Sequence, residues 1–210
     1  YLGKIKFLDV SLRIYGGFGD LQTAIFGSQI DNDIICINIG TGSQIVSICN
    51  DEFIPQNNID LKPFFGNYLK AITHIPAGRS FNQIKKLVFK EIDFWNHMSL
   101  VDHDEILDSR EFSLNIFETN WKYDQNNIAI IKALSSEKDI FKKILNNFCL
   151  EYLNALRDFD TQDKYSSIIL TGGRLKDIPY IHNFFKSINN YKLIDSKPDI
   201  DETLMGLDRL

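Results

Sequence analysis

The chain has 210 residues, enough for one large domain or two small ones, and 44% of them are hydrophobic. Its net charge of −5 argues against nucleic-acid binding, which requires a basic face, and no apolar stretch approaches the roughly 20 residues that span a bilayer. We therefore expect neither nucleic acid nor a membrane among its partners. The first residues do not follow the plan of a signal peptide, and three cysteines without paired spacing predict buried, reduced thiols in a cytoplasmic protein.

The first part of the chain predicts a strand and then a helix. Residues 12–15 have the composition of a strand that ends at a pair of glycines, and a helix of about three turns is expected from Asp20. An aspartate at a helix start is most simply a cap. The same position would also hold a carboxylate ionised and rigid, so that it could accept a proton from a hydroxyl nucleophile. The residues alone leave both interpretations open.

Residues 33–49 consist of two runs of β-formers around the break Gly40-Thr41-Gly42-Ser43, a pattern typical of a hairpin. A tip with two glycines and two hydroxyls offers backbone N–H and O–H donors with little side-chain bulk, which favours an anion. The simpler alternative is that the turn needs glycine for its φ angles.

A third strand is expected at Asn67–Ile75, so the three strands predict an antiparallel meander. A helix should begin after Pro76-Ala77-Gly78, where the amides of its first turn would be free to meet an anion. A plain turn into a helix explains Gly78 equally well. The apolar residues expected on one face of this helix are Phe81, Ile84, Leu87, Val88 and Ile92.

Residues 96–134 have no clear pattern and are interpreted as an insertion, with an acidic helix start at Asp102–Glu105 and a short strand at Phe112–Phe117. Residues 135–157 predict a long helix packed across a sheet, with Cys149 as a core residue. Its apolar ridges are Ile140, Ile144, Phe148, Tyr152 and Leu156, with Phe141, Leu145, Cys149 and Leu153 beside them.

The last third of the chain predicts strand, glycine turn, helix, strand and a closing helix. An apolar strand at 167–171 runs into Gly172-Gly173, and a helix follows from about Asp177, with Pro179 in its first turn. Glycines in such a turn let a flat ring or a phosphate approach the backbone, although β-to-α turns often use glycine for other reasons. A strand near 191–194 and a helix at 201–207 complete the chain.

In this order, the segments resemble the C-terminal half of a carbohydrate kinase of the FGGY family. The matching segments are GDLQTAIFG (19–27), INIGTGSQIV (37–46), FFGNYLKAITHIPAGRSFNQI (64–84), IILTGGRLKDIPYIHNFF (168–185) and DETLMGLDRL (201–210). None is specific alone, and their order carries the resemblance. The leucine in GDLQ and the phrase PFFGNYL lean towards the sedoheptulokinase-like branch.

The resemblance implies one α/β domain over 1–210, a ribonuclease-H-like (actin-like ATPase) fold with a mixed sheet flanked by helices. It implies ATP and Mg²⁺ bound in a cleft against an N-terminal kinase domain outside this chain, with a ketose such as sedoheptulose as the expected sugar substrate. Asp20 would be the general base and would contact Mg²⁺ through water. The residues implied at the phosphates are Gly40, Thr41, Gly42 and Ser43, and those implied at the nucleotide are Gly78, Asn82, Gly172, Gly173 and Asp177.

The chain also departs from the family pattern. Where the family often has Gly-x-Arg before the long helix, this chain reads Phe117 to Trp121, and Asn146-Asn147 replace a frequent Glu-Gly. Arg174 and Lys176 make the adenosine loop bulkier and more basic. These departures leave sugar recognition and activity open. The alternatives are a nucleotide-binding module that transfers nothing and an ATPase of the chaperone or actin kind.

Overall fold

A computed structural model describes residues 3–14, 19–28, 30–50, 58–90, 92–101, 137–194 and 202–209. The chain forms two compact units. The first contains residues 1–30 and 197–210, and the second contains residues 31–196. The predicted features between residues 102 and 136, including the acidic helix start and the strand at Phe112–Phe117, lie outside the described residues.

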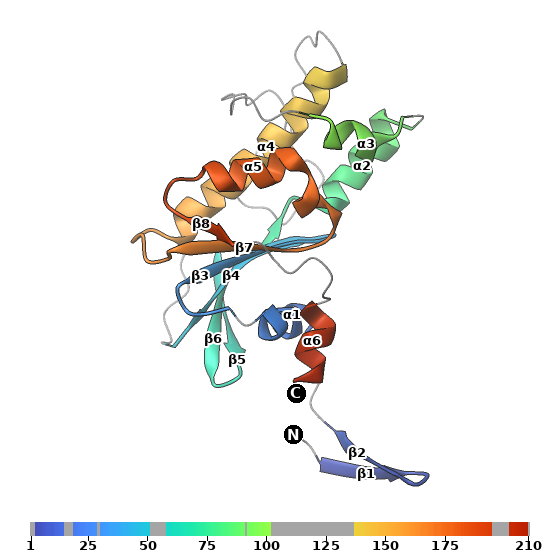
Figure 1. Cartoon of the computed structure of the whole chain (residues 1–210), viewed down its shortest axis with the longest axis vertical. Coiled ribbons are helices and arrows are strands. Elements are labelled where there is room, and N and C mark those ends of the chain that lie inside the picture. The colour runs from blue at the N-terminus through green and yellow to red at the C-terminus, as the bar shows by residue number, and fades with distance from the viewer. Residues whose placement is uncertain are drawn as a thin grey trace. The chain divides into compact units, whose positions relative to one another are not determined.

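The second unit is built on a six-stranded mixed sheet in the order β5-β6-β4-β3-β7-β8 (Figure 1). β3 (Ile34–Ile39), β4 (Ser43–Cys49) and β6 (Asn67–Ile75) pair antiparallel, as the sequence predicts. β7 (Ser167–Gly172) and β8 (Lys192–Ile194) continue the sheet parallel to β3. The sheet therefore joins four antiparallel strands to two strands that run parallel to β3. The predicted meander is wrong in its connections, because β4 and β6 are neighbours in the sheet but are not consecutive in the chain.

The sequence analysis missed β5 (Ile59–Phe64), which lies between β4 and β6 in the chain and pairs with the outer side of β6. It is an edge strand, the position where a proline such as Pro63 is tolerated. A two-residue turn joins it to β6, and both turn residues have left-handed backbone, with φ of 42° at Phe65 and 86° at Gly66.

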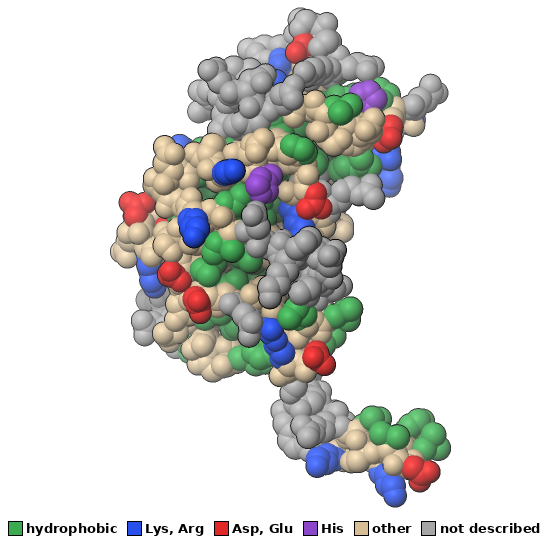
Figure 2. Space-filling model, in the orientation of Figure 1, with side chains coloured by type: hydrophobic (Ala, Val, Ile, Leu, Met, Phe, Trp, Pro, Cys, Tyr) green, Lys and Arg blue, Asp and Glu red, His purple; other side chains and the backbone are tan. Residues whose placement is uncertain are grey.

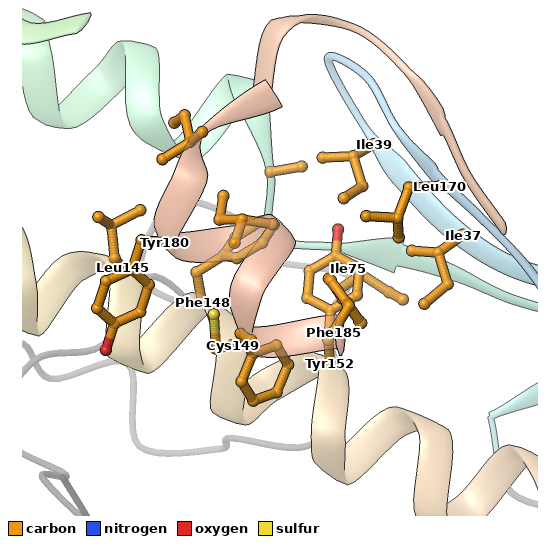
Figure 3. Close-up of a cluster of buried hydrophobic side chains, with 14 of the residues drawn as sticks. Ile37, Ile39, Ile75, Leu145, Phe148, Cys149, Tyr152, Leu170, Tyr180 and Phe185 are labelled. Carbon is orange, nitrogen blue, oxygen red and sulfur yellow. The ribbon is translucent and has the colours of Figure 1, made fainter. Parts of the chain in front are cut away.

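The helices of the second unit pack on one face of the sheet (Figure 1). α4 (Glu137–Phe159) confirms the predicted long helix, and its ridge residues Phe148, Cys149 and Tyr152 are fully buried against the sheet and α5 (Pro179–Ser187) (Figure 3). α2 (Gly78–Val88) and α3 (Phe94–Ser99) add Phe81, Ile84, Phe94 and Met98 to the same core.

The face predicted for α2 is wrong in part. Phe81 and Ile84 are buried, but Leu87 is 65% exposed. At about 100° per residue, Leu87 lies roughly 120° around the helix from Phe81, outside the buried stripe. Ile92 lies beyond the end of the helix, and Phe89 occupies the core position just after α2.

The first unit contains the hairpin β1 (Gly3–Phe7) and β2 (Val10–Ile14), the helix α1 (Asp20–Ser28) and the closing helix α6 (Glu202–Asp208). The register pairs Ile5 with Leu12 and Phe7 with Val10, so these four side chains share one face of the hairpin. All four are exposed, and Figure 2 shows hydrophobic side chains on the surface of this hairpin.

The three cysteines are buried and form no disulfide, as predicted. Cys149 is fully buried in the core of the second unit, and Cys36 is fully buried with its sulfur 3.4 Å from the Thr171 hydroxyl. Within the described residues, no helix combines the length and apolar character needed to cross a membrane.

Candidate functional site

The candidate site of the second unit lies at the carboxyl ends of β3 and β7. These neighbouring parallel strands are paired so that Ile39 lies opposite Gly172. The hairpin tip that follows Ile39 and the glycine turn that contains Gly172 therefore leave the sheet side by side. A backbone hydrogen bond of 2.8 Å from Gly173 N to Ile39 O joins them. Ligands of open α/β sheets bind at this edge.

The start of α2 joins the same edge, because its first two amides donate to the hairpin tip. Gly78 N donates to Gly40 O at 3.1 Å, and Arg79 N donates to Thr41 O at 2.8 Å. These two amides were expected to be free for an anion, and instead they hold the tip. A Cβ at Gly78 would lie 2.7 Å from Gly40 O, so close packing explains this glycine. Its contact with a nucleotide stays a prediction.

The simpler alternative, that the tip needs glycine for its φ angles, does not explain Gly40 and Gly42. Neither Gly40 nor Gly42 has a positive φ, so the turn does not need glycine for its backbone angles. A Cβ added at Gly42 would meet no atom within 4 Å. Among the described residues, the amides of Thr41 and Gly42 have no hydrogen-bond acceptor. The tip thus presents two consecutive unpaired N–H groups beside open space, an arrangement that suits an anion.

The Ser43 hydroxyl is committed to the protein interior. Ser43 is fully buried, and its Oγ donates to Asn38 O at 2.5 Å and accepts a hydrogen bond from the Tyr152 hydroxyl. A contact between Ser43 and a phosphate stays a prediction, and with these bonds in place it would use the backbone of Ser43.

The β7 turn places three predicted nucleotide contacts on the surface. The three exposed residues are Gly172, Gly173 and Asp177. Asp177 ends a short 3-10 helix, Arg174–Asp177. Gly172 has a φ of 99°, and a Cβ there would lie 2.7 Å from Ile39 O, so the fold requires glycine at this position. Asn82 is also exposed, one helical turn beyond Gly78 on α2.

In the first unit, Asp20 is the first residue of α1, as predicted, and its side chain lies outside the described atoms. Gly19 O accepts hydrogen bonds from Thr23 N at 3.1 Å and from Thr23 Oγ1 at 2.9 Å, so Gly19 occupies the cap position. α6 packs against this helix, because a Cβ at Gly206 would lie 1.9 Å from Thr23 O. The approach of Asp20 to the hairpin tip stays a prediction.

The sequence analysis missed the hydrogen bond from Tyr152 to Ser43 of the tip. It placed Tyr152 only on an apolar ridge of the long helix. Its ring rises from α4 towards the sheet, between Phe148 and Phe185 (Figure 3). Burial raises the pKa of the Tyr152 hydroxyl above its ordinary value, which keeps it a hydrogen-bond donor. The one available signal was the choice of tyrosine at a core position, since a buried tyrosine hydroxyl needs a partner.

Several solved kinase structures are similar to this chain. A xylulose kinase from Lactobacillus acidophilus matches with a TM-score of 0.68 and 18% identity over 90% of this chain and 40% of that chain. A gluconate kinase from the same species gives 0.65 and 18% over the same shares. A Plasmodium falciparum glycerol kinase with ADP gives 0.63 and 15% over 92% of this chain and 41% of that one. The predicted α/β, actin-like ATPase fold is confirmed.

Sequence comparison assigns no family. No protein-family model matches the chain. A phenylalanine–tRNA ligase beta subunit from Mycoplasma mobile is 26% identical over 151 residues, which make up 70% of this chain and 19% of that protein. The chain thus spans about a fifth of that subunit and about two fifths of the similar kinases.

Proposed function

We propose that this chain is the ATP-side half of a carbohydrate kinase of the FGGY family. One observation carries the proposal. Backbone hydrogen bonds join the hairpin tip, the β7 turn and the start of α2, each of which contains glycine, at one edge of the sheet. Two of these loops carry an exposed residue, Thr41 in the tip and Gly173 in the β7 turn. The similarity of the fold to three kinases with different substrates supports the reaction type, and it names no sugar.

The proposed roles divide the loops between the parts of ATP. The tip, Gly40 to Ser43, receives the transferring phosphates, and the unpaired amides of Thr41 and Gly42 supply donors where negative charge develops. Gly172, Gly173 and Asp177 border the adenine and ribose, with Gly78 and Asn82 nearby. The open space at Gly42 fits a phosphate group, because a glycine there leaves room that a side chain would fill.

Asp20 is the proposed general base. Its carboxylate takes the proton from the sugar hydroxyl as the hydroxyl oxygen bonds to the γ-phosphorus, and the bond from that phosphorus to the bridging oxygen of ADP breaks. Asp20 would also hold Mg²⁺ through water, and the bound ion would neutralise part of the charge on the phosphates. The position of Asp20 at the start of α1 supports the role, since a carboxylate there is favoured in its ionised form.

The proposed partner is a sugar-side kinase domain, either in the same protein or on a separate chain. Its support is that the match to the xylulose kinase structure covers 90% of this chain but only 40% of that chain. That domain would supply part of the sugar pocket and the second Mg²⁺-holding carboxylate, so this chain alone should be inactive. We propose a ketose as the substrate, with sedoheptulose the first to test, on the resemblance of GDLQ and PFFGNYL alone.

The proposal is tested by measuring ADP release from Mg-ATP by this chain together with its sugar-side domain. The assay covers sedoheptulose, xylulose, gluconate and glycerol, with wild type and Asp20→Asn. We expect sugar-dependent ADP release from the wild type and a loss of at least about a hundredfold in Asp20→Asn. ATP binding without release on any sugar would favour a non-catalytic nucleotide-binding module. Equal rates for both proteins would exclude Asp20 as the base.

A further inference from the structure

Tyr152 and Ser43 form a buried link between α4 and the hairpin tip. The Tyr152 hydroxyl donates to Ser43 Oγ, and Ser43 Oγ donates to Asn38 O at 2.5 Å. Both side chains are fully buried. Asn38 precedes the last residue of β3, and Ser43 is the first residue of β4. The link therefore closes the base of the tip from both of its strands and ties it to a helix on the face of the sheet.

The other hydrogen bonds of the tip hold different parts of it from the Tyr152–Ser43 link. α2 holds the carbonyls of Gly40 and Thr41, and Gly173 N holds Ile39 O. Within the tip, Gly40 N donates to Gly42 O at 3.1 Å. Because a peptide unit is planar, the bonds from α2 to the carbonyls of Gly40 and Thr41 also set the directions of the amides of Thr41 and Gly42. The position from which the tip leaves the sheet depends instead on how the chain passes from β3 and back into β4, which is where Asn38 and Ser43 lie.

We propose that Tyr152 is a positioning residue for phosphate binding, acting through Ser43 to fix the position from which the tip, with the amides of Thr41 and Gly42, leaves the sheet. The inference rests on the proposed function, because it assigns a phosphate to this tip. Tyr152 itself touches no ligand in this account. Its ring packs against Phe148 and Phe185, with ring centroids 4.5 Å and 5.8 Å away, and this packing holds the ring in place. Its hydroxyl therefore reaches Ser43 from a fixed position.

The chain contains a matched control for this link. Tyr165 makes the same kind of contact with β4, with its hydroxyl 2.7 Å from Ser47 Oγ. Both tyrosines are buried and both serines are buried. Ser47 lies four residues further along β4, away from the tip. Removing either tyrosine hydroxyl therefore deletes a similar hydrogen bond, but only one of the two bonds is at the phosphate-facing end.

The test compares Tyr152→Phe and Tyr165→Phe with wild type for binding of Mg-ATP and of adenosine, by NMR titration of the chain. Phenylalanine keeps the ring, so the core stays filled. We expect Tyr152→Phe to weaken Mg-ATP binding about fivefold to tenfold, because a displaced tip would lose the equivalent of about one hydrogen bond to the phosphate, and to leave adenosine binding unchanged. Tyr165→Phe should leave both affinities unchanged.

Different outcomes overturn different claims. If Tyr152→Phe weakens ATP and adenosine equally, or if Tyr165→Phe has the same effect on ATP, the link is merely structural and the inference is wrong. If wild type binds ATP no better than adenosine, the phosphate site itself is wrong and the proposed function falls with it. As a second readout, the ligand-free amide resonances of Thr41 and Gly42 should shift in Tyr152→Phe and stay in place in Tyr165→Phe.

Discussion

Two glycines at the candidate site should differ strongly in how much the same substitution destabilises the fold. Gly172 has a φ of 99°, and a Cβ there would lie within 2.7 to 2.9 Å of the Ile39 backbone. A left-handed backbone costs an L-residue roughly 1–2 kcal/mol, and forcing an extra carbon into packed structure costs about 1–3 kcal/mol. We therefore expect Gly172→Ala to lower the free energy of unfolding by about 2–5 kcal/mol.

Gly42→Ala is the control, because Gly42 lacks a positive φ and a Cβ there meets no atom within 4 Å. Its free energy of unfolding should change by no more than about 0.5 kcal/mol. Urea unfolding followed by circular dichroism measures both variants against wild type. The reasoning is wrong if Gly42→Ala is as destabilising as Gly172→Ala, or if Gly172→Ala costs less than about 1 kcal/mol.

The Gly42→Ala variant also separates folding from function. If a phosphate occupies the open space at Gly42, the added methyl group should weaken Mg-ATP binding by about tenfold while the fold remains intact. An unchanged affinity for Mg-ATP would show that this space receives no ligand. Glycine at this position would then have no explanation in either the fold or the site.

Three further predictions concern the rest of the chain. Burial lowers the pKa of Lys70 below its ordinary value of 10.5, so between the lowered pKa and 10.5 the unfolded chain binds more protons than the folded chain. Stability should rise over that range more steeply in wild type than in Lys70→Met, and parallel pH profiles in urea unfolding would contradict this. Gly206→Ala should loosen α1 from α6, because its Cβ would lie 1.9 Å from Thr23 O. Hydrogen exchange of the α1 amides should accelerate, and unchanged exchange would refute the packing argument. A thiol reagent should label the three buried cysteines slowly in the native protein and quickly in urea, and fast native labelling would contradict their burial.

Local sequence patterns predicted the positions of the main strands and helices, because β-branched runs, glycine breaks and helical spacing act over a few residues. The hairpin tip and the Gly172 turn were found in this way. The edge strand β5 was missed because Pro63 weakens its pattern, although an edge position tolerates proline. Leu87 was misplaced because the predicted apolar residues spread over a wider arc of the helix than the stripe that α2 buries.

The candidate site was less predictable, because its key features are contacts between distant residues. Tyr152 and Ser43 are 109 residues apart, and no local pattern reports their hydrogen bond. The sequence alone also does not distinguish a glycine that the fold requires from one that it does not require. The structure separates Gly78 and Gly172, which the fold requires, from Gly42, which it does not require. That distinction directs the phosphate proposal to the tip.

The most direct test of the account is an NMR titration of the isotope-labelled chain with Mg-ATP up to millimolar concentrations. The account predicts that the amide resonances of Thr41, Gly42 and Gly173 shift together with one dissociation constant, because the loops that carry them meet at one edge of the sheet. Adenosine should shift Gly173 and leave Thr41 and Gly42 in place. Shifts confined to other parts of the chain, or none at any of these amides, would contradict the account.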